Sequence, residues 1–284
     1  MRTKSRVVFD YSYNSWFFII QNLSNFNIVL KHSLLFKSVI GAENYNLKKE
    51  DEKPYYKIFV NPSFDDLYTN KTISDRNSLS LNEDKSYSYD DIRVLAKSLV
   101  KPNIYFIEAL YSGSITINEN LDTKSKDLIN KLLENKDIIS KINLSHLYDS
   151  CIGIFKSRYT KALKNLSNNI YGYNTEEAFE CWRILDFLRA YADSNFNNFK
   201  GALWYEESNN KRKFLIDLRN GLFSLNEFKQ IINDTFTNIK NDFEEKYKKF
   251  EFDKETAIFV EDIAKDLFYI NLRNMPRFSL ETTY

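Results

Sequence analysis

The sequence predicts an α+β fold in which a mixed sheet with flanking helices is followed by a helical bundle. Two strand-like apolar runs, residues 34–40 and 55–60, lie early in the chain. From about residue 120 onward, nearly every segment has the apolar spacing of a helix. The chain of 284 residues is long enough to bury a full core. We therefore expect an α/β domain over residues 1–120 and a helical domain over residues 121–284.

The first elements follow from apolar spacing and turn residues. Apolar residues at helical spacing predict a first helix that is capped by Asn14 or Ser15 and runs to about Asn25. The strand over 55–60 is stopped by Asn61-Pro62, which cannot continue a sheet ladder. The charged run 48–53, which precedes this strand, is expected to be a solvated loop.

A third strand is expected over Tyr87–Tyr89, after which Asp90-Asp91 opens a helix with acids at its positive end. In the following segment, residues 103–110, Glu108 is either a packing residue or a site residue. Further helices are predicted at Ser125–Ser140, Ser145–Asn168, Thr175–Ser194, Ser224–Phe250 and Lys254–Arg273.

The composition excludes several classes of protein. The 40 basic and 39 acidic residues nearly cancel, so no overall field points to nucleic acid. Two cysteines, Cys151 and Cys181, are typical of unpaired buried thiols in a reducing compartment. His32 and His146 lie far apart and predict no zinc site, and residues 16–20 are too short an apolar run to span a bilayer. We expect a cytoplasmic protein with no cofactor and no membrane partner.

The two strands and their flanks carry a motif. It resembles the core of the nucleotidyltransferases of the DNA polymerase β superfamily, most closely a bacterial and phage group with the pattern G-S-x-x-Y-N-L, a short acidic linker and S-D-x-D-Y-K-x-F-V-x-P-x-F-x-D-L-Y. The resemblance covers about residues 14–245. The matching residues are Gly41, Tyr45, Asn46, Leu47, Tyr56, Lys57, Phe59, Val60, Pro62, Phe64, Asp66, Leu67 and Tyr68.

The sequence departs from this family at its chemical positions. The resemblance implies two carboxylates, two residues apart on one strand, that hold Mg²⁺; Lys53 and Tyr55 stand there instead. The family's phosphate-contacting serine is replaced by Ala42. A third carboxylate is expected on the next strand, where Ser86 and Ser88 stand. The resemblance therefore implies a nucleotidyltransferase fold that has lost catalysis and its metal.

A catalytic alternative stays open because Glu50 and Glu52 are also two residues apart. Their carboxylates would replace the missing pair if the strand began earlier. Further ligands would come from Asp51, Asp65 or Asp66. Pro54 argues against an early start, since proline lacks a ladder donor and tends to mark a strand's first residue or an edge.

The helix from Thr175 resembles a family motif K-H-A-x-H-x-x-R-x-L, but Glu176 and Glu180 replace the basic residues. An acidic face there would repel a nucleoside triphosphate. Glu176, Glu180 and Arg183 are spaced to share one face, either as a solvated ion pair or as a partner-binding surface. Arg219 is expected to pair with these acids. The binding candidates are Tyr45 and Tyr55, both expected to be exposed, and Lys57, Glu176, Glu180, Arg183 and Arg219.

A basic strip marks the helix that begins near Ser145. Phe155 and Tyr159 alternate with its cations, and such a pattern is found where RNA bases stack. A solvated helix face is the commoner meaning of this pattern. The RNA candidates are Lys156, Arg158, Lys161 and Lys164.

Three functions are consistent with these observations. The first is a catalytically degenerate binding or inhibitory module whose partner is a protein or a protein–RNA complex. Because the family pattern is common in phages, analogy suggests a target in a host defence system. The second is an active Mg²⁺-dependent transferase that modifies RNA or protein through Glu50 and Glu52. The third is a nucleotide or RNA sensor without turnover.

Overall fold

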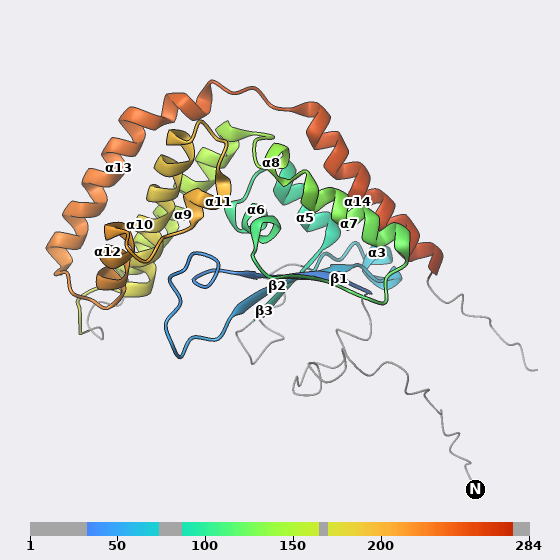
Figure 1. Cartoon of the computed structure of the whole chain (residues 1–284), viewed down its shortest axis with the longest axis horizontal. Helices are drawn as coiled ribbons and strands as arrows, with labels where there is room; N and C mark the ends of the chain where they lie inside the picture. Colours follow the sequence, from blue (N-terminus) through green and yellow to red (C-terminus); the bar gives the residue numbers. More distant parts are fainter. Residues whose placement is uncertain (1–32, 74–86, 165–169, 275–284) are drawn as a thin grey trace, which may run out of the picture.

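The computed structural model describes residues 33–73, 87–164 and 170–274. It confirms the α+β fold, with a mixed sheet near the N-terminus and a mainly helical remainder (Figure 1). The helix predicted over 14–25, His32 and Ser86 lie outside the described residues. The strands are β1 (Ser33–Ile40), β2 (Tyr55–Asn61), β3 (Tyr87–Asp91) and β4 (Ile115–Ile117).

The four strands form one sheet in the order β3-β2-β1-β4. β1 pairs antiparallel with β2 and with β4, whereas β2 pairs parallel with β3. Side chains alternate between the faces of β2, so that Lys57 and Phe59 point toward the helices and Ile58 packs in a separate cluster on the other face. The predicted third strand is confirmed and runs two residues further, through Asp91. β4 was not predicted from the sequence.

The predicted helices that the structure describes occupy their expected places with shifted ends, whereas no helix was predicted over Ile104–Tyr111, Phe199–Leu203 or Asn210–Arg219. The predicted helix over 125–140 is interrupted at Asn135, and the one over 145–168 ends at Ala162. The described helices are α3 (Phe64–Tyr68), α5 (Ile92–Val100), α6 (Ile104–Tyr111), α7 (Thr123–Glu134), α8 (Lys136–Ile139), α9 (Leu144–Ala162), α10 (Thr175–Asp193), α11 (Phe199–Leu203), α12 (Asn210–Arg219), α13 (Leu225–Lys248) and α14 (Lys254–Asn274).

Side-chain caps fix the starts of several helices. Ser224 and Glu227 form a complete capping box at the start of α13. The Asn174 side chain accepts bonds from the first backbone amides of α10. Asp91 alone caps α5, whereas Asp90 still belongs to β3. The expectation that both aspartates open the helix is therefore wrong for Asp90.

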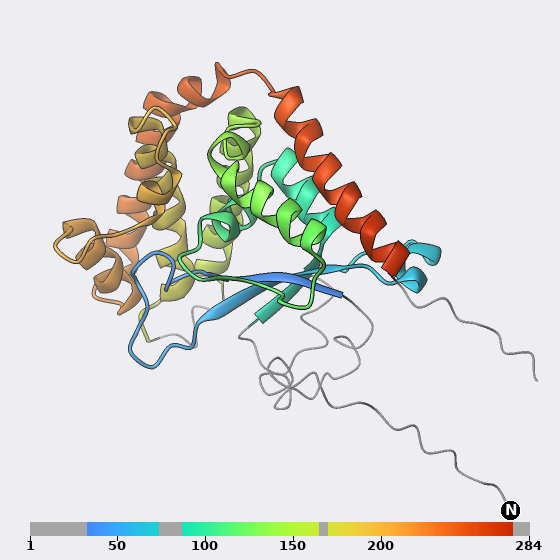
Figure 2. The same ribbon diagram turned by 45° about the vertical axis from the view of Figure 1, so that its right-hand side comes forward.

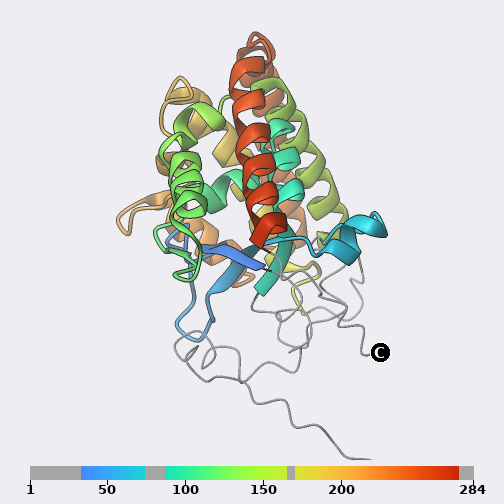
Figure 3. The ribbon, with the colours of Figure 1, turned by 90° about the vertical axis from the view of Figure 1, so that its right-hand side faces the viewer.

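The helices gather on one side of the sheet (Figures 1 and 2). α13 and α14 form the two sloping arms of an arch over the other helices (Figure 1). α14 descends beside α5 and α7, and in the side view it lies across the front of the helical layer (Figure 3). The last described helix thus returns to the part of the chain that carries the sheet.

One hydrophobic core runs through both predicted domains. It joins Phe36 and Phe59 of the sheet to Leu188 of α10 and Leu267 of α14. Both cysteines are buried and free, as predicted. Among the described residues, no helix is both long and apolar enough to cross a membrane.

Candidate functional site

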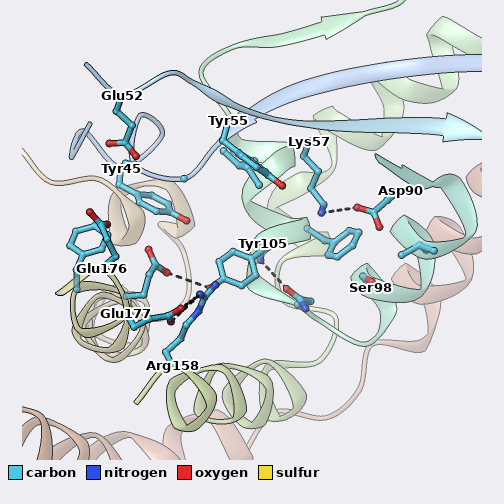
Figure 4. Close-up of a pocket in the computed structure, with 18 of the residues that line it drawn as sticks. Tyr45, Glu52, Tyr55, Lys57, Asp90, Ser98, Tyr105, Arg158, Glu176 and Glu177 are labelled. Atoms are coloured by element: carbon cyan, nitrogen blue, oxygen red, sulfur yellow. Dashed lines mark hydrogen bonds and ion pairs between the residues drawn. The ribbon is translucent and has the colours of Figure 1, made fainter. Parts of the chain in front are cut away.

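A cleft of about 1010 Å³ opens where the sheet meets the helical part of the chain (Figure 4). One wall is the turn after β1 together with the start of β2. The opposite wall comes from α9 and α10, and α5 and α6 close the back. The end of α12 contributes Arg219. Residues far apart in the sequence therefore meet in this cleft.

The turn after β1 is anchored by a buried carboxylate. Gly41 has φ +82°, a conformation that glycine adopts without steric cost. Its backbone N–H donates to Glu108 Oε1 of α6 at 2.6 Å, and the Tyr45 hydroxyl donates a short hydrogen bond to the other oxygen. Asn44 Nδ2 adds a bond of 3.3 Å to Oε1. Glu108 thus braces the turn, which confirms its packing role.

Burial raises the pKa of the Glu108 carboxyl to about 7, although the positive charge of Arg183 and the hydrogen bonds from Tyr45, Gly41 and Asn44 act in the opposite direction. The carboxyl group of Glu108 therefore accepts a hydrogen bond from the backbone amide of Gly41, the glycine of the family motif. The neighbouring Ala42 has no hydroxyl with which to contact a phosphate.

The predicted exposure of Tyr45 is wrong. Only 1% of its surface is accessible, because the turn folds back and places the ring under the Arg183 guanidinium, 4.0 Å from the ring centroid. Arg183 is itself fully buried, so it does not belong to a solvated helix face. Its guanidinium bonds Glu180 at 2.8 Å. Tyr55 is half-buried and lines the cleft.

A buried ion pair lies on the sheet floor. Lys57 Nζ is 2.7 Å from Asp90 Oδ2, both side chains are 1% exposed, and the ammonium group lies 4.1 Å from the centroid of the Phe106 ring. The pairings Lys57–Ser88 and Phe59–Asp90 between β2 and β3 place Ser88 and Asp90 on the same face as Lys57. Ser88 is one of the positions read as a lost third carboxylate.

Asp90 was not predicted as a site residue, and neither were Tyr105, Phe106 and Glu177, which also line the cleft. A carboxylate does lie on this strand, two residues after Ser88, because β3 continues through Asp91. The signal was the period of two that leads from Ser88 to Asp90. Of the other replaced positions, Lys53 is exposed and precedes β2, whereas Tyr55 is the first residue of β2.

Ion pairs join the turn and its loop to α10 at the cleft mouth. Arg219, which is 8% exposed, bonds Glu52 at 3.0 Å and Glu176 at 2.7 Å, and it donates to the Leu47 carbonyl. Lys49 adds a second contact to Glu176 at 3.1 Å. The predicted pairing of Arg219 with the acids of α10 is confirmed for Glu176, whereas Glu180 bonds Arg183 instead.

Arg158 of α9 closes the other side of the mouth by bonding Glu177 at 3.0 Å. The remaining cations of the predicted RNA strip, Lys156, Lys161 and Lys164, are exposed on the outer face. Phe155 is 5% exposed and its ring stacks on Phe236 inside the core. The aromatic rings of the strip therefore face inward, away from these lysines.

The residues of the cleft do not fit the Mg²⁺ ions that the resemblance implies. Such ions need converging carboxylates, whereas the sheet floor offers Asp90 beside the Lys57 ammonium. Both oxygens of Glu52 accept from Arg219, and Glu50 is exposed on the loop. The described part of the chain contains no group of three or more His, Cys, Asp or Glu residues that could hold a metal.

Comparisons of the chain with protein-family models, with curated proteins and with solved structures found no match. The likeness to nucleotidyltransferases stays an expectation from the sequence motifs. The structure itself shows a cleft that is lined by paired charges and by aromatic side chains.

Proposed function

We propose that this protein is a nucleotidyltransferase-like binding module that does not transfer nucleotides. The observation that carries the proposal is the pairing of the cleft's carboxylates with cations. Asp90 pairs with Lys57, Glu52 and Glu176 pair with Arg219, and the remaining pairs are Glu177 with Arg158 and Glu180 with Arg183. A carboxylate held by an ammonium or guanidinium group is a poor ligand for a divalent cation.

The geometry also argues against the alternative in which Glu50 and Glu52 carry catalysis. Glu52 would have to leave Arg219, and Arg219 would then lie beside the metal as a repelling charge. We expect the partner to be a protein or a protein–RNA complex, and a host defence component is the target that the phage-like motif suggests by analogy.

The test is transfer of labelled nucleoside monophosphate from each common nucleoside triphosphate to cellular RNA or protein, with Mg²⁺ or Mn²⁺. We expect no labelling above the background without protein. The matched variants are Glu52→Gln and Asp90→Asn. If the wild type labels RNA or protein and either substitution abolishes this labelling, the proposal is refuted. The alternative of an active transferase would then be supported.

One observation favours a second candidate, binding of a nucleotide without turnover. The cleft volume of about 1010 Å³ exceeds what one nucleotide needs, and Tyr55, Tyr105 and Phe106 supply ring surfaces. Calorimetry with nucleotides in the absence of metal tests this candidate. Binding that Tyr55→Ala weakens at least about tenfold, and that Tyr68→Ala outside the cleft leaves unchanged, would support it.

A further inference from the structure

A second concave surface lies outside the cleft, between α5 and α14. These helices lie side by side and leave a groove of about 480 Å³. Ala96 and Val100 of α5 and Ala264 of α14 line its apolar base. Lys97 lines both the groove and the cleft, so the two surfaces are continuous along α5.

The α5 side of the groove carries regularly spaced positive charge. Arg93 and Lys97 of α5 and Lys101, the C-cap of this helix, recur every four residues, so the three cations follow one side of the helix to its end, about 6 Å apart. Arg93 is partly neutralised by Asp91, at 2.7 Å. Lys97 and Lys101 are exposed, and neither forms an ion pair with another described residue. Glu261 is the acid that lines the opposite wall.

The α14 side supplies aromatic surface. Tyr269 is 59% exposed, although large aromatic side chains are usually covered. Its ring centroid is 5.9 Å from that of Phe268, and both residues line the groove. Proteins bind single-stranded nucleic acids with this arrangement of an exposed aromatic ring next to a line of cations. The phosphates contact the cations, and a base stacks on the ring.

We propose that the α5–α14 groove binds a segment of single-stranded RNA, with Lys97 and Lys101 on successive phosphates and Tyr269 stacked against a base. The regular spacing of the cations suits a polymer of regularly spaced charges better than an acidic protein segment. This inference rests on the version of the proposed function in which the partner is a protein–RNA complex. It assigns the RNA to the α5–α14 groove and not to the predicted basic strip on α9.

The experiment is fluorescence anisotropy with a labelled oligouridylate of about 12 nucleotides, without Mg²⁺ or nucleotide, between about 50 and 200 mM salt. Lys97→Gln/Lys101→Gln should weaken binding at least about tenfold and reduce the log–log salt slope by about 1.4, or 0.7 for each phosphate contact. Tyr269→Ala should weaken binding roughly five- to one-hundred-fold with an unchanged slope. All three side chains are exposed on the surface, so the variants are expected to fold, which thermal unfolding checks.

The matched control is Lys156→Gln/Lys161→Gln, which removes the same charge from the exposed face of α9 and should leave affinity unchanged. The proposal is overturned if the wild type does not bind the oligonucleotide at the lower salt, or if the α9 variant loses binding while the α5 variant keeps it. Displacement of the RNA by polyglutamate at equal charge, together with no effect of Tyr269→Ala, would assign the groove to an acidic protein instead. Because the binding experiment contains no nucleoside triphosphate and no Mg²⁺, its results do not depend on the outcome of the transfer assay for the proposed function.

Discussion

Lys57 and Asp90 show how a single residue pair can decide both stability and chemistry. The ion pair is 1% exposed on each side, so the cost of desolvation is recovered only while both charges are present. Lys57→Met removes the ammonium partner, and we expect the free energy of unfolding to fall by about 3–5 kcal/mol. Urea denaturation measures this change.

Lys97→Met serves as the control for this prediction. Lys97 is exposed on the same cleft, and its loss should change stability by less than about 0.5 kcal/mol. The double variant Lys57→Met/Asp90→Asn should recover part of the loss, since the two residues are in contact. Equal stability of Lys57→Met and the wild type would show that the pair contributes little.

Glu108 gives stability a pH dependence. Its folded pKa is raised to about 7 from a reference value of 4.5, so the folded state binds a proton more tightly than the unfolded state. Its contribution is complete below the unfolded pKa and is lost as pH rises toward about 7. Glu108→Gln removes this dependence while keeping an acceptor for the Gly41 amide.

The measurement compares the free energy of unfolding of the wild type and of Glu108→Gln from about pH 5 to pH 8. Relative to the variant, the wild type should lose up to about 3 kcal/mol over this range. A difference between the two proteins that does not change with pH would place the folded pKa of Glu108 near its ordinary value.

Individual site residues were predictable where the interaction is local in sequence or follows from a motif. The pairing of Arg219 with Glu176 followed from the motif and from charge. Tyr45 and Arg183 were predicted on the surface, yet they are buried because two distant segments enclose them together. Such burial depends on tertiary contacts, which periodicity within one helix or turn does not encode.

At the scale of elements, the loop between β1 and β2 is held to the helical part by side chains rather than by a sheet ladder. Arg219 contacts Glu52, Glu176 and the Leu47 carbonyl, and Arg212 donates to the Asn46 carbonyl. These charged contacts act together with the bonds of the turn to Glu108 and with the Tyr205 N–H, which donates to the Tyr45 carbonyl at 3.0 Å.

Arg219→Ala should release this loop, with a loss of about 1–3 kcal/mol in the free energy of unfolding. Amide hydrogen exchange should accelerate over residues 42–54 and stay unchanged in the centre of α10. Lys265→Ala removes an exposed pair with Asp262 and should cost less than about 0.5 kcal/mol without changing exchange in the loop. Unchanged protection of the Leu47 amide in Arg219→Ala would show that other contacts hold the loop.

The long elements were predictable because their signals are repeated along the sequence. Apolar residues recur at regular spacing along the full length of β1, β2, α10, α13 and α14. In addition, the capping residue Ser224 marks the start of α13. β4 and α11 were missed, since three and five residues carry too little periodicity to be recognised. α6 and α12 were also missed, because α6 is apolar on nearly all sides and α12 is mostly charged or polar, so neither has a clear apolar stripe. Their conformation is set by the neighbours against which they pack.

At the scale of the whole molecule, the predicted boundary near residue 120 does not interrupt the core. Buried side chains form one cluster from Phe36 of β1 to Leu267 of α14. We expect the chain to unfold in one cooperative transition, because neither predicted domain can lose its structure without exposing part of this cluster.

The prediction is tested by following urea unfolding with far-ultraviolet circular dichroism, which reports on the helices, and with exchange protection of β1 and β2. The midpoints should coincide, and Leu267→Ala should shift both midpoints together, with a loss of about 2–5 kcal/mol. Two separate transitions, or a shift confined to the helical signal, would show that the two predicted domains are independent.

The place of α14 also has a consequence for the order of events during synthesis. α5 and the sheet are made early, but the helix that covers α5 ends at Asn274, far along the chain. While the ribosome is still translating the intervening segments, the nascent chain leaves part of the surface of α5 uncovered. We expect the nascent chain to need a molecular chaperone most at this stage of its synthesis.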